Sequence, residues 1–214
     1  MTCIKDLALF ERSIKSIAQY GVISPSIKII VIANDDISLV DKLVELTNPL
    51  SLNVDILHYS AVDEWTGHIG WDSQQYFKLA VAKLITTPWY LIMDSDNCLW
   101  DYVPVDEMIS NNYAFCLWEQ ATDHHREYLH RAQAIWNLPK TINCLSDSAP
   151  FIMHTNTVKN LLPYVNKTWF NFDVPGSLHT FEFFLYYAYL TYTNTLDALY
   201  IKKPNGPLIR GITR

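Results

Sequence analysis

The hydrophobic pattern in the first half of the chain alternates between helical and strand spacing. Residues 7–20 carry apolar side chains at helical intervals, which predicts an amphipathic helix. Residues 27–33 form a compact apolar run rich in β-branched side chains, which predicts a buried strand. The same patterns predict further helices at residues 37–46 and 72–85 and further strands at residues 54–59 and 89–93. Alternation of strands and helices predicts an α/β fold with a mainly parallel central sheet flanked by helices.

The pattern is looser after residue 101. It predicts strands at residues 113–118 and 150–153, helices at residues 155–165 and 182–190, an exposed loop or helix at the charged, His-rich residues 123–131, and a closing loop at residues 202–214. We find no internal repeat and no low-complexity segment. The sequence therefore predicts one domain over residues 1–214, with a nucleotide-binding-like first half and a more irregular second half.

The most informative segment is an apolar run that ends in two acids. Asp94 and Asp96 follow the predicted strand at residues 89–93 and are separated by one residue. Alternate residues of an extended chain face the same side, so both carboxylates can reach one cation. Ligands of open α/β sheets bind beyond the carboxyl ends of the strands, where this pair lies. Mn²⁺ and Mg²⁺ take carboxylates, waters and substrate phosphates, so the pair predicts a site for Mn²⁺ (or Mg²⁺).

Three chemistries use two such acids. A helix–loop–helix calcium site needs more acids, a glycine and a late Glu. Cys98 and Leu99 occupy the positions of a ligand and of the glycine, so this segment does not match such a site. A phosphatase with an aspartyl nucleophile also starts from a strand and two alternate Asp, but near the N-terminus and with Thr or Val following, whereas Asn97 and Cys98 follow here. The third is a nucleotide-sugar glycosyltransferase, in which the acids hold a metal that bridges the donor diphosphate.

Two segments around this strand resemble GT-A glycosyltransferases. Residues 70–79 read GWDSQQYFKL and residues 90–96 read YLIMDSD. They are similar to small bacterial and viral members, and more distantly to glycogenin-like enzymes, in which a helix bearing Gln and Lys precedes the strand that delivers the two acids. The resemblance covers most of the chain and implies a single GT-A (Rossmann-like) domain. About residues 1–100 would be its nucleotide-binding half and about residues 101–214 its acceptor-side half.

The resemblance also implies an activity and partners. It implies a metal-dependent transfer of a sugar from a nucleotide diphosphate donor, with a UDP-sugar favoured, to a hydroxyl of a glycan, lipid-linked or protein acceptor. A non-catalytic carbohydrate- or nucleotide-binding module on a degenerate scaffold of the same fold is the alternative, and an aspartyl phosphatase comes third.

Individual residues receive roles by the same resemblance. Asp94, Asp96 and His179 are the expected metal ligands, with His154 as the other possibility for the third. Residues that would contact the nucleotide sugar are Lys5, Asp6, Asp35, Trp71, Gln75, Lys78 and Ser95. Residues 2–6 are similar to the first strand of the family and the turn that borders the nucleotide. Glu182 is similar to the acid that the family places over the reaction centre, and Asp147 is a competing catalytic acid.

The composition of the chain argues against nucleic acid as a partner and favours a cytoplasmic location. The chain has 16 Lys and Arg against 22 Asp and Glu, a net charge of -6, which argues against binding nucleic acid through its phosphates. The 13 Tyr and 7 Trp suit either a large aromatic core or a sugar site. The 4 cysteines are scattered without a CxxC pair, and we find no secretory signal and no membrane-length apolar run. We therefore expect a soluble cytoplasmic protein without an integral membrane segment.

Overall fold

The computed structural model describes residues 4–20, 27–65, 67, 69–146, 149–171, 173, 177–203 and 212–213. Its α-helices are α1 (Leu7–Tyr20), α2 (Ser38–Thr47), α3 (Trp71–Ala80), α4 (Asp123–Ile135), α5 (Thr155–Leu161), α6 (Glu182–Tyr192) and α7 (Leu196–Leu199). Its strands are β1 (Ile29–Ala33), β2 (Val54–His58), β3 (Trp89–Ile92), β4 (Cys98–Leu99), β5 (Ile109–Ser110), β6 (Tyr113–Gln120), β7 (Asn143–Leu145), β8 (Phe151–His154), β9 (Tyr200–Lys203) and β10 (Ile212–Thr213). The prediction of a mixed α/β chain is confirmed.

The elements with strong hydrophobic periodicity are close to their predicted bounds. The predicted helix at residues 7–20 is α1, and the His-rich stretch forms the helix α4. The predicted helix at residues 72–85 ends earlier, because α3 gives way to the 3₁₀ helix Val81–Leu84. The predicted helix at residues 155–165 also ends early, as α5, because Pro163 lies in the next 3₁₀ turn.

The start of the chain differs from the prediction. The resemblance placed a strand and a turn at residues 2–6, but residues Ile4–Asp6 form a 3₁₀ helix that runs into α1. Residues 2 and 3 lie outside the described part of the chain. Lys5 and Asp6, which the resemblance placed in the turn, lie in this 3₁₀ helix.

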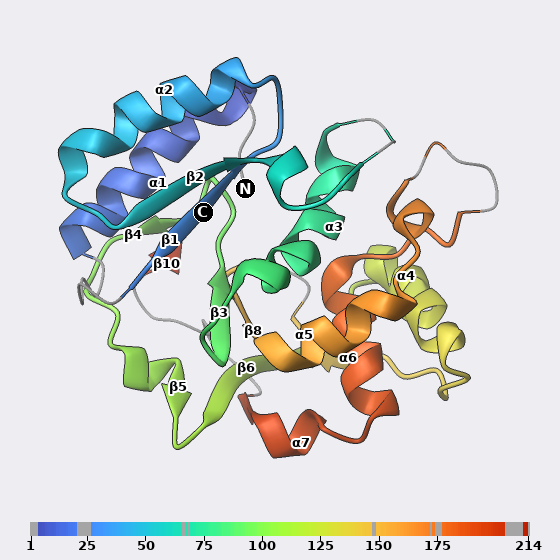
Figure 1. Ribbon diagram of the computed structural model, residues 1–214. Coiled ribbons are helices and arrows are strands. Elements are labelled where there is room, and N and C mark those ends of the chain that lie inside the picture. The colour runs from blue at the N-terminus through green and yellow to red at the C-terminus, as the bar shows by residue number, and fades with distance from the viewer. Residues whose placement is uncertain are drawn as a thin grey trace.

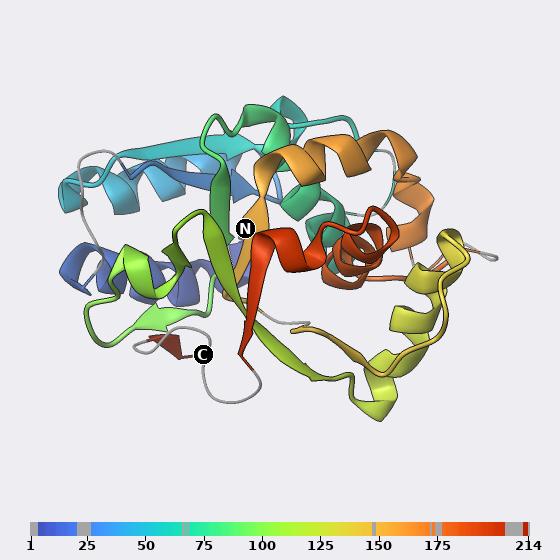
Figure 2. The ribbon, with the colours of Figure 1, turned by 90° about the horizontal axis from the view of Figure 1, so that it is seen from below.

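The strands pair in several small sheets. β1 pairs with β2 in parallel, from Ile29 opposite Val54 to Ala33 opposite His58. β3 pairs antiparallel with β8, and β6 pairs antiparallel with β5 and β7. β9 runs parallel to β6, as Figure 2 shows, and β10 runs antiparallel to β4. Within the described residues only the pairs β1–β2 and β6–β9 are parallel, so these pairings do not show the mainly parallel central sheet that the sequence predicts.

Two large hydrophobic cores and a small cluster around Leu99 and Val103 pack the described elements together. In Figure 1, α1 and α2 lie on one side of β1 and β2, where Phe10 and Leu43 pack with Val31. The larger core surrounds α6, in which all nine residues from 182 to 190 are buried. A helix that is apolar on every side belongs in the middle of a domain, so α6 is central to the second half. No helix among the described residues is both long enough and apolar enough to cross a membrane.

Asp63 ties the loop after β2 to the second half of the chain. Its carboxylate accepts hydrogen bonds from the Tyr76 hydroxyl, from Lys83 Nζ at 2.6 Å and from Lys167 Nζ at 3.2 Å. Burial alone would raise the pKa of Asp63, but these three donors outweigh it and hold that pKa well below its usual range. A lowered pKa contributes stability above the ordinary value of 3.8, and this contribution is lost as the pH falls towards the folded value.

We expect Asp63→Asn to lower the free energy of unfolding at pH 7 by about 2 kcal/mol, because charge-assisted hydrogen bonds are lost. The difference from wild type should shrink as the pH falls below about 4, measured by denaturant unfolding at several pH values. Asp106→Asn, at an exposed acid, is the control and should change little. An equal difference at pH 3 and pH 7 would show that the charge of Asp63 contributes nothing.

Candidate functional site

The turn after β3 holds the two acids that the sequence singled out. Asp94 N–H donates to Asn97 Oδ1 at 2.8 Å, and Asn97 N–H donates to the Asp94 carbonyl at 3.0 Å. Asn97 is only 1% exposed, so its side chain fixes the turn from inside. Sequence reasoning missed this role, although an Asn that closes an Asp-rich turn is a common signal of a side-chain-stabilised turn.

Lys78 joins this turn to a helix far away in the sequence. Its Nζ lies 2.9 Å from Asp94 Oδ1 and 3.0 Å from Glu182 Oε1. The side chains of Lys78 and Glu182 are 8% and 1% exposed, whereas that of Asp94 is 28% exposed. α3 supplies the lysine, the end of β3 supplies one acid, and the first residue of α6 supplies the other. The structure therefore brings together three residues that the sequence predicted separately.

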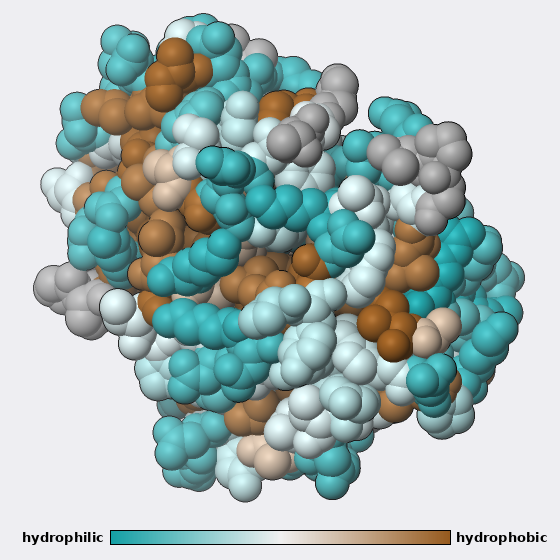
Figure 3. Space-filling model, turned by 45° about the vertical axis from the view of Figure 1, so that its right-hand side comes forward, coloured by the Kyte–Doolittle hydropathy of each residue, from teal (hydrophilic) through white to brown (hydrophobic). Residues whose placement is uncertain are grey.

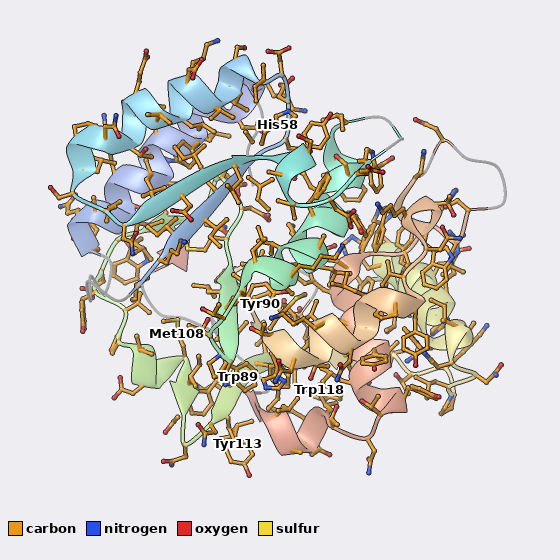
Figure 4. All side chains as sticks on the ribbon, in the orientation of Figure 1. His58, Trp89, Tyr90, Met108, Tyr113 and Trp118 are labelled. Carbon is orange, nitrogen blue, oxygen red and sulfur yellow. The ribbon has the colours of Figure 1, made fainter. Side chains whose placement is uncertain are left out.

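Gln75 completes this group, one helical turn before Lys78 on α3. With its amide nitrogen turned towards α6, Gln75 Nε2 donates to both oxygens of Glu182, at 3.1 Å to Oε1. Lys78 Nζ lies 5.1 Å from the centre of the Phe183 ring, and the Tyr90 hydroxyl donates to the Lys78 carbonyl at 3.1 Å. Figure 4 shows Tyr90 between β3 and the segment that follows α3. We call Gln75, Lys78, Asp94 and Glu182 the Lys78 network.

The charges of the Lys78 network depend on one another. Burial would lower the pKa of Lys78, but the carboxylates of Glu182 and Asp94 outweigh it and raise that pKa, so the ammonium stays charged. Burial raises the pKa of Glu182, and Lys78 opposes this without cancelling it. With both acids ionised, one ammonium faces two carboxylates. In that state the network has an excess of negative charge, which would favour a further cation nearby.

Asp96 adds a second acid whose bonding is incomplete. Among the described residues, the buried atoms Asp96 Oδ1 and Asn97 Nδ2 have no hydrogen-bond partner. A buried carboxylate oxygen without a donor is costly, and a hard divalent cation is a common remedy. The residues at the end of β3 therefore fit a Mg²⁺ or Mn²⁺ ion. No group of three His, Cys, Asp or Glu in the described part of the chain is arranged to hold a metal, so the structure does not bring His179 to Asp94 and Asp96.

Two further predicted site residues, His154 and Trp71, make their contacts outside the Lys78 network. His154 is the other expected third ligand. Its Nδ1 lies 2.9 Å from Thr157 Oγ1 and its ring packs against Trp89, so its contacts join the end of β8 to the start of α5 and to β3. Trp71 starts α3 and is 52% exposed. Its ring packs edge-on against the ring of Phe181, the residue before Glu182, with 5.3 Å between the ring centres. It is therefore a surface residue and not part of the core.

The residues near the nucleotide-binding half have other partners. Lys5 is exposed and Asp6 is half-buried in the 3₁₀ helix at the start of the chain. The Asp35 carbonyl lies 3.0 Å from His58 Nε2, which connects the ends of β1 and β2. Asp147 lies outside the described residues. The structure does not place Lys5, Asp6 or Asp35 in the Lys78 network.

Asn34 positions α3 and was missed by sequence reasoning. It follows β1, is 1% exposed, and its Nδ2 donates to the Gly70 carbonyl at 2.8 Å. Ser73 Oγ donates to Asn34 Oδ1 at 3.1 Å. These bonds fix the first turn of α3 against the end of β1, and so they set where Gln75 and Lys78 point.

Two members of the Lys78 network, Lys78 and Asp94, line a cavity of about 1110 Å³. Lys78, Asp94 and Ser95 line one part of it, which places the predicted Ser95 at the site. Cavities of this order hold drug-sized ligands. The arrangement therefore combines Asp94 and the buried ammonium of Lys78 with a cavity at the carboxyl end of β3.

Comparisons with known proteins identify a family but no activity. No curated protein matches the sequence. Among solved structures, the crystal structure of mouse xyloside xylosyltransferase 1 in its apo form is similar, with 11% identity, 92% of this chain and 80% of that chain covered, and a TM-score of 0.46. Similarity at this level carries no argument about what this chain does. A family described as "Family of unknown function (DUF6492)" matches residues 4–211. Because this match spans nearly the whole sequence, the chain belongs to the DUF6492 family.

Proposed function

We propose that the protein is a metal-dependent glycosyltransferase, which moves a sugar from a nucleotide diphosphate donor, foremost a UDP-sugar, to an acceptor hydroxyl. The observation that carries the proposal is the meeting of Lys78, Asp94 and Glu182 beside Asp96. One place thus offers carboxylates for a cation, a buried ammonium for a phosphate and a buried carboxylate for the acceptor. The resemblance of residues 70–79 and 90–96 to GT-A enzymes supports the same class. The proposal includes the GT-A fold, with β1 and β2 in a mainly parallel sheet.

Asp94 and Asp96 are the residues that would hold Mn²⁺ or Mg²⁺. The unsatisfied oxygen of Asp96 supports this assignment. Donor phosphates and waters are the expected further ligands, as in other sites that bind such ions together with a phosphorylated substrate. An ion bound there supplies Lewis-acid stabilisation of the departing nucleoside diphosphate.

The protein residues have separate tasks in this proposal. The Lys78 ammonium has three N–H donors and two are directed to Asp94 and Glu182, which leaves the third for a phosphate oxygen. Because the ammonium is already fixed by these two contacts, it stabilises developing negative charge without reorganising. Glu182 orients the acceptor hydroxyl. Its raised pKa suits the base of an inverting enzyme, and its charge suits stabilisation of the sugar cation in a retaining one.

Nucleotide binding tests the proposal before any product is known. We expect UDP with Mn²⁺ to raise the melting temperature by about 5–10 °C at a concentration of about 100 times its dissociation constant. UDP without Mn²⁺ should give a smaller rise, since the diphosphate then lacks its cation. The shifts in melting temperature that GDP and ADP give with Mn²⁺ show which nucleotide base the protein prefers. If no nucleotide shifts the melting temperature with or without Mn²⁺, the proposed function is wrong.

A second candidate is a non-catalytic module that binds a carbohydrate or nucleotide. The observation in its favour is that both oxygens of Glu182 already accept hydrogen bonds within the protein, from Lys78 and Gln75. A panel of nucleotide sugars with Mn²⁺, with release of nucleoside diphosphate and the product anomer as readouts, separates the candidates. Nucleotide binding with no transfer or hydrolysis across the panel would support the binding module, and a phosphoenzyme at Asp94 would support a phosphatase.

A further inference from the structure

Trp71 lies at the outer end of a helix face whose inner end is Lys78. Trp71, Gln75 and Lys78 follow one another on α3 at intervals of four and three residues, so their side chains share one face of the helix. Gln75 and Lys78 are 4% and 8% exposed, whereas Trp71 is 52% exposed. This face of α3 therefore leads from the buried Lys78 network to the surface of the molecule.

At the surface, Trp71 joins a group of rings around Phe181, the residue before Glu182. The ring centres of Trp71 and Phe181 lie 5.3 Å apart. Tyr128 of α4 stacks on Phe181 with 4.4 Å between ring centres, and the His125 ring packs edge-on against Phe181 at 5.4 Å. In Figure 1, α3, α4 and α6 lie next to one another, which lets these four rings meet. We call Trp71, His125, Tyr128 and Phe181 the aromatic shelf.

The aromatic shelf has an apolar base and a polar rim. Phe181 is buried beneath it, His125 and Tyr128 are half-buried, and Trp71 is exposed. Indole, imidazole and phenol groups each combine a flat ring with a polar atom at the edge of that ring. A sugar ring has the complementary form, because its C–H groups make apolar faces and its hydroxyls make a polar rim. The shelf therefore suits a carbohydrate better than a purely apolar or a purely polar ligand.

The position of Trp71 separates it from the part of the site that takes the diphosphate. The described residues that line the cavity include Lys78 and Asp94 but not Trp71. An α-helix rises 1.5 Å per residue, so Trp71 and Lys78 are about 10 Å apart along α3. Glu182 lies between them, because it contacts Lys78 and Gln75 and follows the ring that Trp71 packs against. A molecule on Trp71 is therefore close to Glu182 but away from the diphosphate, which is the place of the acceptor and not of the donor.

We propose that the aromatic shelf binds the acceptor, and that the acceptor is a carbohydrate with a sugar ring stacked on Trp71. This inference rests on the proposed function and narrows its acceptor to one class. It also moves Trp71 from the nucleotide sugar, where the sequence resemblance placed it, to the acceptor.

The other two acceptor classes fit the aromatic shelf less well. A lipid chain would cover the rings but would leave the polar rim without partners. In Figure 3, hydrophobic residues reach the surface among hydrophilic ones on the face shown, which is also a poor surface for a lipid. A protein acceptor would offer a Ser or Thr hydroxyl on a short side chain, with no flat surface to lie on Trp71.

Binding of small probes to the full chain, with UDP and Mn²⁺ present, tests the inference. The carbohydrate probes are the methyl β-glycosides of glucose, galactose, xylose and N-acetylglucosamine. A short serine peptide, acetyl-Gly-Ser-Gly-amide, and octanol represent the protein and lipid classes. We expect at least one glycoside to receive NMR saturation transfer when the aromatic protons of the protein are irradiated, because its C–H groups lie on the rings of the shelf. The peptide and octanol should receive none.

Three variants check the location. Trp71→Ala should weaken binding of that glycoside at least about tenfold, because the ring on which the sugar lies is gone. Trp71→Tyr keeps a flat ring with a polar edge, so its binding should stay within about threefold of wild type. Trp100→Ala is the matched control, since Trp100 is 58% exposed and lies directly after β4, and it should bind as wild type does.

The outcomes separate this inference from the proposed function. Suppose that UDP with Mn²⁺ raises the melting temperature but no glycoside binds, that the peptide or octanol binds instead, or that Trp71→Ala binds a glycoside as wild type does. The aromatic shelf is then not a carbohydrate acceptor site, although the proposed function stands. If no nucleotide binds with or without Mn²⁺, the proposed function is wrong, and the acceptor role of the shelf is wrong with it, even where a glycoside still binds through Trp71.

Discussion

Replacing Lys78 with Met should lower the free energy of unfolding by about 3–5 kcal/mol at pH 7. The substitution keeps the length of the side chain but leaves Glu182, which is 1% exposed, without its counter-ion. Removing one member of a buried ion pair is strongly destabilising, because the remaining charge stays desolvated. Asp94 loses the same contact, but it is more exposed and water can compensate it in part. Denaturant unfolding with a common m-value measures the difference.

The pH dependence of this variant identifies the cause. In Lys78→Met the opposing charge is gone, so burial raises the pKa of Glu182 further. A raised carboxyl pKa lowers stability at pH values above the folded pKa, and this loss disappears as the pH falls towards 4.5. The difference from wild type should therefore shrink in acid. Adding Glu182→Gln should recover a large part of the lost stability at pH 7, since the unpaired charge is removed.

Lys83→Met is the matched control for Lys78→Met. Lys83 lies in the 3₁₀ helix that follows α3 and pairs with Asp63, but its side chain is 46% exposed. Exposed ion pairs contribute about 0–1 kcal/mol, so this variant should lose at most about 1 kcal/mol, clearly less than Lys78→Met. If Lys78→Met and Lys83→Met unfold at the same denaturant concentration, the Lys78 network does not hold α3 to α6.

The local part of the fold could be predicted from the sequence. The helix at α1 and the strands β1, β2 and β3 follow from periodicity and β-branched runs, which act over a few residues. The pairing of β3 with β8 could not be predicted in this way. Its register joins Trp89 to His154, far apart in the sequence, and depends on the packing of the second core.

In the candidate site, too, features within a few residues of each other could be predicted, whereas contacts between separate elements could not. The position of Asp94 and Asp96 after a strand is a local feature, and the sequence located it. The ion pairs of Lys78 with Asp94 and Glu182 join three elements, and no spacing rule relates residues on separate elements. The bonds of Asn34 and Asn97 were missed for a further reason: a buried amide has the same sequence signal as an exposed loop residue.

Replacing Asp96 with Asn should abolish the effect of Mn²⁺ without destabilising the protein. Asp96 Oδ1 is buried and has no hydrogen-bond donor among the described residues, so the protein loses no contact there and repulsion between neighbouring acids falls. Asp94→Asn should differ, because it also loses the 2.9 Å ion pair with Lys78. We therefore expect an unchanged or higher melting temperature for Asp96→Asn and a lower one for Asp94→Asn.

Both variants should lose Mn²⁺-dependent release of nucleoside diphosphate from a donor sugar, on the order of 10²- to 10³-fold, the effect of removing one stabilising group from a preorganised site. They should also lose the extra thermal shift that Mn²⁺ gives with UDP, which is a readout independent of turnover. Asp101→Asn, at an exposed acid near the same turn, is the control and should keep both. If Asp96→Asn keeps the Mn²⁺ shift and the turnover, these acids do not hold the metal. A loss of both at an unchanged melting temperature separates metal binding from folding, because only a residue that serves a ligand gives that combination.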